Sequence, residues 1–224
     1  MKKIILFIFI FLLLILFLLE SDRNRYNTES FYNFYIKQFP NSLYYGIYNS
    51  TFKIFYNNCI FNINEFDFYH DFNKNKNHIL KELNNFDYNG KSIYSHDDNK
   101  GLDKDVNYKI LKIKFFNNFY HKKEFKTIYK LCEKHKNIRT CFFSIIKGKK
   151  IIPYHTGPYC GLLRCHIPII INKNHDSHMI INDIKINCSE PFIFDDTYVH
   201  KLEKLDNFLR IVLIIDIDHP NKLF

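Results

Sequence analysis

The sequence contains no alanine and no tryptophan, whereas asparagine, lysine, isoleucine, phenylalanine and tyrosine are abundant among its 224 residues. This bias is typical of AT-rich codons, so the formal net charge of +9 is weak support for a nucleic-acid partner. Lysines are scattered along the chain, with acidic residues and histidines beside them, and no known nucleic-acid-binding motif accompanies them. We therefore expect no nucleic-acid partner.

The sequence also lacks cysteine motifs and internal repeats. No Cys-x-x-Cys pair occurs among the six cysteines, which argues against a structural zinc site. In an oxidising compartment, Cys132 and Cys141 would be the best candidates for a disulfide, and the sequence leaves the pairing open. The chain length allows one domain with appendages.

Residues 4–19 form sixteen uninterrupted apolar residues behind Lys2 and Lys3. As a helix this run would span about 24 Å. No small-residue cleavage site follows it. We predict an uncleaved signal anchor over residues 1–20, with a cleaved signal peptide as the alternative. The two lysines would keep the N-terminus cytoplasmic, which predicts a single-pass type II protein of the endoplasmic reticulum or secretory pathway with a lumenal catalytic domain.

Two glycosylation sequons accompany this topology, Asn49-Ser50-Thr51 and Asn187-Cys188-Ser189. They would be used only if the domain is lumenal.

Behind the anchor, we predict a stalk or irregular lead-in over residues 21–59 and one domain over residues 60–224. Helical spacing of apolar residues predicts short helices at 72–86 and at about 122–135, with a surface loop at 87–104 between them. Short β runs bounded by Gly, Pro, Asn and Asp follow the pattern of an antiparallel sandwich or barrel. These runs begin near Val106 and continue at 141–147, 150–154, 161–171, 178–187, 191–195 and 208–217. We expect His200 to end a strand.

His155-Thr156-Gly157-Pro158 and the later His200 and Arg210 are the strongest chemical signal. Two histidines beside strand-like runs can bind one divalent metal, and an arginine ten residues past the second can reach a carboxylate bound beside that metal. These parts suit a non-haem iron oxygenase that uses a 2-oxo acid. The usual third ligand, an Asp or Glu two residues after the first histidine, is replaced by Gly157.

The residues alone leave other interpretations open. With eleven histidines, most are incidental. Arg164 and Arg210 could be ordinary salt-bridge partners, although a buried arginine is costly without an anion. Asp195 and Asp196 are interpreted as turn residues or as supports for the metal ligands, with a direct ligand role as the alternative.

The segments HTGPYCGLLRCHIPI and FIFDDTYVHKLEKLDNFLRIVLIIDIDHP resemble the catalytic core of the aspartyl/asparaginyl β-hydroxylase family. The resemblance is close over about residues 140–220 and diffuse over residues 60–139. It implies an Fe(II)- and 2-oxoglutarate-dependent dioxygenase. It also implies a mainly β fold, a double-stranded β-helix of the jelly-roll or cupin-like type with flanking helices.

This family binds iron through two histidines, with a glycine in place of the carboxylate, so Gly157 fits the resemblance. His155 and His200 are then implied as the iron ligands, and Arg210 as the partner of the distal carboxylate of 2-oxoglutarate. The resemblance places four further residues in the co-substrate pocket: Ser144, Arg164, His166 and Tyr108, the last in place of a family tryptophan.

The implied substrate is an Asp or Asn side chain, hydroxylated at its β-carbon, in secretory-pathway proteins that include disulfide-rich domains. One alternative is a lipid acyl chain, because membrane-bound relatives of this core act on lipids. The other is a catalytically inactive binding module. Retention of both histidines and both arginines argues against an inactive module.

Overall fold

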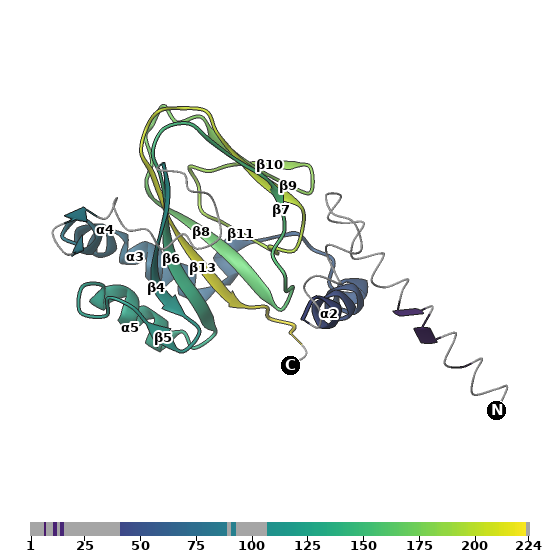
Figure 1. Cartoon of the computed structure of the whole chain (residues 1–224). Coiled ribbons are helices and arrows are strands. Elements are labelled where there is room, and N and C mark those ends of the chain that lie inside the picture. Colours follow the sequence, from purple (N-terminus) through teal and green to yellow (C-terminus); the bar gives the residue numbers. More distant parts are fainter. Residues whose placement is uncertain are drawn as a thin grey trace.

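The computed structural model describes residues 41–88, 91–92 and 107–222, together with Phe7, Phe11, Leu12, Leu14 and Ile15 (Figure 1). The predicted anchor, the first part of the predicted stalk and most of the predicted loop at 87–104 therefore lie outside the described residues. Within the described residues, no helix is both long enough and apolar enough to cross a membrane.

Two antiparallel sheets make up the core of the domain. The larger has the strand order β1 (Ile60–Phe61), β11 (Phe192–Phe194), β8 (Leu162–Ile170), β13 (Arg210–Asp218), β6 (Ile138–Ile146), β4 (Tyr108–Phe115) and β5 (Asn118–Phe119). The smaller has the order β10 (Ile184–Asn187), β9 (Ser177–Ile181), β12 (His200–Lys204) and β7 (Lys150–His155). A separate hairpin joins β2 (Asp87–Tyr88) and β3 (Lys91–Ser92). The prediction of a mainly β, jelly-roll-like fold is confirmed.

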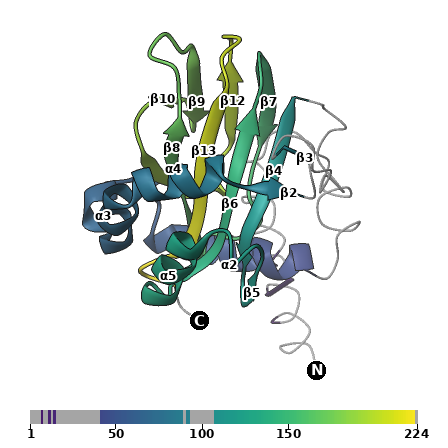
Figure 2. The same ribbon diagram turned by 90° about the vertical axis from the view of Figure 1, so that its left-hand side faces the viewer.

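The central strands of the large sheet are apolar along nearly their whole length because both of their faces are covered. Helices α3 (Asp67–Lys74), α4 (Lys76–Asn84) and α5 (Lys126–Lys134) cover the outer face (Figure 2). Phe125 and Phe143 are fully buried between helices and sheet. Burial of each such side chain contributes about 1.5–3 kcal/mol.

Two strand predictions were wrong in detail. The run at 178–187 is a hairpin of β9 and β10, because Asn182 and Asp183 adopt φ of 46° and 65° at a tight turn. His200 begins a strand, β12, instead of ending one. The preceding turn is closed by Asp195, whose Oδ1 accepts hydrogen bonds from the backbone N and Oγ1 of Thr197 at 2.9 and 2.6 Å.

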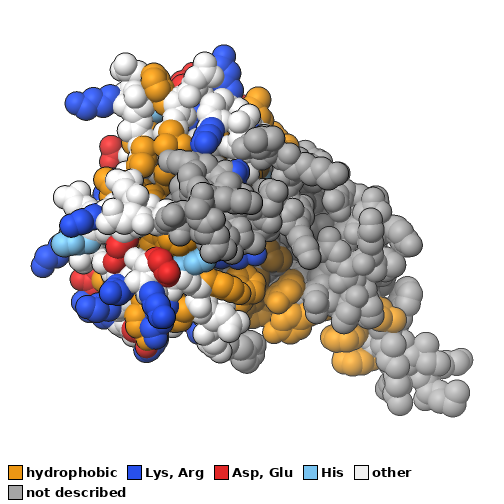
Figure 3. Space-filling model, turned by 60° about the vertical axis from the view of Figure 1, so that its left-hand side comes forward, with side chains coloured by type: hydrophobic (Ala, Val, Ile, Leu, Met, Phe, Trp, Pro, Cys, Tyr) orange, Lys and Arg blue, Asp and Glu red, His pale blue; other side chains and the backbone are white. Residues whose placement is uncertain are grey.

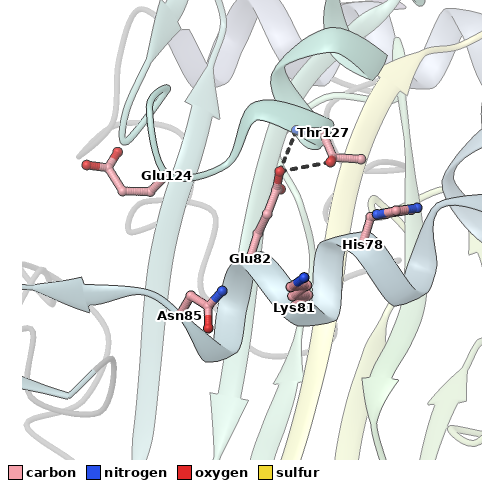
Figure 4. Close-up of a pocket in the computed structure, with 6 residues that line it drawn as sticks. All are labelled: His78, Lys81, Glu82, Asn85, Glu124 and Thr127. Carbon is pink, nitrogen blue, oxygen red and sulfur yellow. Dashed lines mark hydrogen bonds between the residues drawn. The ribbon is translucent and has the colours of Figure 1, made fainter.

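The helix predicted at 72–86 is two helices, α3 and α4, which meet at Asn75. The helix predicted at about 122–135 is the shorter α5. Phe125 stands at its N-cap and cannot accept a hydrogen bond through its side chain. Glu82 of α4 does so instead, since its Oε1 lies 2.8 Å from both the N and the Oγ1 of Thr127 (Figure 4). This carboxylate accepts from one otherwise free backbone N–H at the positive end of α5.

Residues 41–55, predicted as irregular, form helix α2 (Asn41–Phe55), which corrects the prediction. Aromatic side chains at helical spacing attach this helix to the domain. Tyr48 lies 5.0 Å from the ring of Tyr159, and Phe52 makes an edge-to-face contact with His219 at 4.9 Å. The helical period is hard to read in a segment where nearly every second residue is aromatic or asparagine.

The six cysteines are all free. Cys132 and Cys141, the pair predicted as the best disulfide candidates, lie side by side in the core with their thiols hydrogen-bonded. Burial, followed by the neighbouring Cys132 thiol, raises the pKa of Cys141 well above its usual value.

Candidate active site

The two predicted metal ligands lie opposite each other in the smaller sheet. His155 ends β7, His200 begins β12, and the two residues are paired in register with ring centroids 4.1 Å apart. Their Nδ1 atoms lie 2.8 and 2.7 Å from the carbonyl oxygens of Pro153 and Tyr198. A carbonyl only accepts, so each Nδ1 carries the hydrogen and each Nε2 keeps a free lone pair. Both histidines can therefore bind a metal through Nε2.

His200 is held in the neutral form that binds metals. It is 2% exposed, and burial, followed by the nearby His155, lowers its pKa to about 3. A metal ligand must be unprotonated, so this environment prepares the ring for coordination. His155 is exposed, at the edge strand of its sheet.

Asp196 explains the glycine at position 157. A β-carbon added to Gly157 would lie 2.1 Å from Asp196 Oδ2, so the carboxylate fills the space that a side chain would need. The other oxygen of Asp196 lies 3.4 Å from Nε2 of His200. Among the described residues, no three His, Cys, Asp or Glu side chains form a metal-binding group. The site thus offers two histidines and the nearby carboxylate of Asp196, which comes from the turn before His200 and not from position 157.

Arg164 forms ion pairs in the structure, which is one of the two interpretations that the sequence left open. Its Nε and Nη2 donate to Asp216 at 2.8 and 3.1 Å, and its Nη1 donates to Asp196 at 2.8 Å. The contact with Asp216 follows from strand pairing, because Asp216 lies directly across from Arg164 in the β8–β13 ladder. A role for Arg164 in co-substrate binding stays a prediction. Arg164 lines the cavity, and its guanidinium is already hydrogen-bonded to the carboxylates of Asp196 and Asp216.

Arg210 is the opposite case. It begins β13, is 2% exposed, and its Nε and Nη2 have no hydrogen-bond partner among the described residues. A buried guanidinium without a partner is costly, so this position favours a bound anion. The planar fork of arginine matches a carboxylate through two parallel hydrogen bonds. The arrangement fits the distal carboxylate of a 2-oxo dicarboxylic acid.

Three neutral polar groups surround Arg210. Burial, followed by the charge of Arg210, holds the pKa of His166 well below its usual range, and its Nδ1 has no partner within the described part of the chain. Burial raises the pKa of Tyr108, which hydrogen-bonds Ser144. These groups can donate to or accept from a bound acid without adding charge.

One cavity of about 400 Å³ unites all seven predicted residues. It is lined by His155, His200, Arg210, Ser144, Arg164, His166 and Tyr108. The sequence interpretation missed its apolar walls, which include Ile110, Phe142, Ile152, Met179, Leu202 and Ile214. Period-two alternation could have identified three of them, because Ile110, Phe142 and Ile214 share strand faces with Tyr108, Ser144 and Arg210. The close approach of Asp196 to Gly157 had no sequence signal.

Solved structures similar to this chain include cupin and oxygenase proteins. An oxidoreductase of the 2OG-Fe(II) oxygenase family from Burkholderia pseudomallei has a TM-score of 0.38 and 11% identity, covering 50% of this chain and 68% of that one. The Cupin_2 domain of an XRE family transcriptional regulator from Enterobacter cloacae has a TM-score of 0.35 and 9% identity, covering 51% and 98%.

Sequence comparison gives a stronger relationship. The ornithine lipid ester-linked acyl 2-hydroxylase of Rhizobium tropici is 35% identical over 89 residues, which is 38% of this chain and 31% of that protein. The match therefore spans less than a third of that relative. The profile of the family described as aspartyl/asparaginyl beta-hydroxylase matches residues 73–220. This match takes in most of the chain and includes all seven predicted ligand and pocket residues. The chain therefore belongs to the aspartyl/asparaginyl β-hydroxylase family.

Proposed function

We propose that this protein is an Fe(II)- and 2-oxoglutarate-dependent hydroxylase whose metal ligands are His155 and His200. One observation carries the proposal: two facing imidazoles whose Nε2 atoms keep a lone pair share a cavity with Arg210, and the Nε and Nη2 of this arginine have no hydrogen-bond partner among the described residues. When bound, iron activates O2 for insertion of oxygen into a C–H bond, while 2-oxoglutarate supplies two electrons and becomes succinate and CO2. The site binds and orients these reactants.

Arg210 sets the orientation of the co-substrate. Its Nε and Nη2 would donate to the distal carboxylate, so that the 2-oxo end of the acid would face His155 and His200. Ser144, Tyr108 and His166 supply neutral hydrogen-bonding groups around the acid.

Asp196 and the apolar walls complete the site. Asp196, held by Arg164 and by the Gly157 turn, places a negative charge beside the two histidines, which favours a divalent cation there. Met179 and Leu202 line the cavity between the sheets and limit the access of water.

The proposed substrate is the β-carbon of an Asp or Asn residue in a secretory-pathway protein. The description of the matched family supports this choice. A lipid acyl chain is the second candidate, supported by the name of the Rhizobium tropici relative. Both candidates place the same hydroxylation chemistry at the same site.

The two sequons differ in accessibility, which bears on the proposed lumenal location. Asn49 is 1% exposed, and its amide donates to Pro158 O and accepts from Cys160 N, each at 3.0 Å. A glycan on Asn49 is therefore incompatible with the fold, and only Asn187 is exposed. Glycosylation at Asn187 is the usable test of a lumenal domain.

Succinate release from the full chain with Fe(II), 2-oxoglutarate and panels of Asp/Asn peptides and acyl lipids tests this function. His155→Ala and Arg210→Ala should each abolish turnover, because one removes a ligand and the other removes the co-substrate anchor. Two matched controls lie outside the cavity. His178→Ala removes a histidine paired with Glu203, and Arg139→Ala removes an arginine paired with Asp218.

Unchanged turnover in His155→Ala or Arg210→Ala would contradict the site. The panel that supports turnover identifies the substrate class, and turnover with lipids alone would overturn the Asp/Asn proposal.

A further inference from the structure

Helix α2 and the residues after it contact both turns that carry the candidate metal ligands, although this segment precedes the region matched by the family profile, residues 73–220. The first turn, residues 156–160, follows His155. The second turn, residues 195–199, precedes His200. In Figure 1, α2 lies against the end of the domain near the C-terminus.

Asn49 holds the first turn through both ends of its amide. Its Nδ2 donates to Pro158 O and its Oδ1 accepts from Cys160 N, at 3.0 Å in each case. The side chain is almost wholly buried, at 1% exposure. A single rigid amide therefore sets the spacing of two backbone groups within five residues of His155.

Lys53, one helical turn further along α2, holds the second turn. Its side chain is 2% exposed, with Nζ 3.7 Å from Asp195 Oδ2 and 3.9 Å from the ring centroid of Tyr198. The cation thus contacts two residues of this turn at once, through an ion pair and a cation–π contact.

The backbone after α2 adds two hydrogen bonds to the same turn. Cys59 O accepts from Asp195 N at 3.0 Å, and Asn57 O accepts from the hydroxyl of Tyr198 at 2.5 Å. The two turns are also joined directly, because Gly157 N donates to Asp196 O at 2.7 Å. Residues 49–59 therefore clamp a pair of turns that already contact each other.

The polarity of these contacts suggests a role beyond packing. Burying an amide and an ammonium costs free energy unless each is fully paired, whereas apolar residues would attach the helix without that cost. The same helix does use apolar contacts elsewhere, through Tyr48 and Phe52. The two buried polar residues point at the turns beside the ligands.

We propose that Asn49 and Lys53 are positioning residues that keep His155 and His200 at the separation a metal requires, so that α2 forms part of the active site. This rests on the proposed function, because it assumes that the two histidines bind the metal. Residues that do not touch the metal but orient the side chains that bind it typically change metal affinity by 10- to 100-fold when they are removed.

The test uses Co(II) as a probe for the metal site in the full chain, with dissociation constants from calorimetry and the visible spectrum of the bound ion. Asn49→Ala and Lys53→Met should each weaken Co(II) binding by about tenfold and change its spectrum. Thr51→Ala, on the exposed face of α2, should bind as the wild type does. Glu82→Ala removes the cap of α5, far from the turns, and controls for a general loss of stability.

Three outcomes separate the positioning role of Asn49 and Lys53 from the proposed metal site itself. Co(II) affinities of Asn49→Ala and Lys53→Met equal to those of Thr51→Ala and Glu82→Ala would overturn the positioning proposal. Wild-type affinity in His155→Ala would instead overturn the proposed metal site. Lys53→Met removes the cation paired with Asp195 and could prevent folding for that reason. In that case the double variant Lys53→Met with Asp195→Asn is measured instead, since it removes both charges of the ion pair. Wild-type Co(II) binding by that double variant would equally contradict a role for Lys53.

Discussion

Arg164 and Arg210 show how two similar residues on neighbouring strands acquire different tasks. Both lie in apolar contexts, LLRCH and FLRIV, and the sequence interpretation treats them alike. Asp216 pairs with Arg164 across the sheet, and Asp196 reaches the same guanidinium from the turn before His200. Arg210 keeps free N–H groups among the described residues. The distinction depends on where Asp196 and Asp216 lie, which local sequence does not reveal.

Gly157 can be tested directly. In Gly157→Ala the new methyl group would collide with Asp196 Oδ2, so the carboxylate or the turn must move. We expect Co(II) affinity to fall by about tenfold or more. Asp196→Ala alone should also weaken binding, because it removes the negative charge beside the histidines. In the double variant Gly157→Ala with Asp196→Ala the collision is absent, so its loss of affinity should be smaller than the sum of the two single losses. An unchanged affinity in Gly157→Ala would contradict this account of the glycine.

The buried histidines predict a pH-dependent stability. Burial lowers the pKa of His200 to about 3 and that of His166 well below its usual range. An unfolded chain protonates histidine near pH 6.5, so below that pH the unfolded state binds protons that the native state excludes. The unfolding free energy of the metal-free protein should therefore be highest above about pH 6.5 and fall as the pH drops toward 4.

Urea titrations across this pH range measure the effect. His166→Phe, which places an aromatic ring beside Phe192 and Phe194, should reduce the slope by up to about 1.4 kcal/mol per pH unit. Equal slopes in the variant and the wild type would show that His166 titrates normally in the native state.

At the scale of single elements, the sequence predicted strands better than helix ends. Continuous apolar runs identified β6, β8 and β13, because buried central strands need no alternation. Helix ends were less predictable, because their caps come from other elements. The N-terminus of α5 is satisfied by Glu82, 45 residues earlier in the chain.

This cap has a measurable contribution. Glu82→Ala leaves the N–H and hydroxyl of Thr127 without their acceptor and should lower the unfolding free energy by about 1 kcal/mol. Turnover should be unaffected, since Glu82 is not among the residues that line the candidate active site and instead lines another pocket (Figure 4). Denaturant unfolding checks the first expectation, with Glu133→Ala, which removes an exposed i,i+3 ion pair on α5, as the matched control. Equal losses in the two variants would rule out a capping role.

The whole molecule brings together segments that are distant in the chain. The smaller sheet pairs His155 with His200, while the larger sheet supplies Arg210 and His166 to the same cavity. On the face shown in Figure 3, Lys and Arg are interspersed with Asp and Glu. Helix α2 contacts both turns beside the candidate ligands, whereas the predicted boundary at residue 60 places this helix outside the domain.

The fold also decides which sequon is usable. Expressed with a secretion signal in a eukaryotic host, the folded protein should carry a glycan at Asn187 and none at Asn49, whose amide is buried between Pro158 and Cys160. Mass spectrometry of glycopeptides before and after enzymatic deglycosylation measures both positions. Asn187→Gln should remove all glycan from the folded protein, and a glycan on Asn49 would contradict the buried contacts.

The β-rich fold class and the candidate site residues His155, Gly157, His200 and Arg210 could be predicted from the amino-acid sequence. These features are local, because apolar runs define strands and the HTGP motif lies within four consecutive residues. Three other features became evident from the packed chain alone: α2 contacts the turns beside His155 and His200, Arg164 is already paired, and Asp196 fills the space beside Gly157. Each of these depends on contacts between segments at least 32 residues apart, made when the two sheets and the helix pack together.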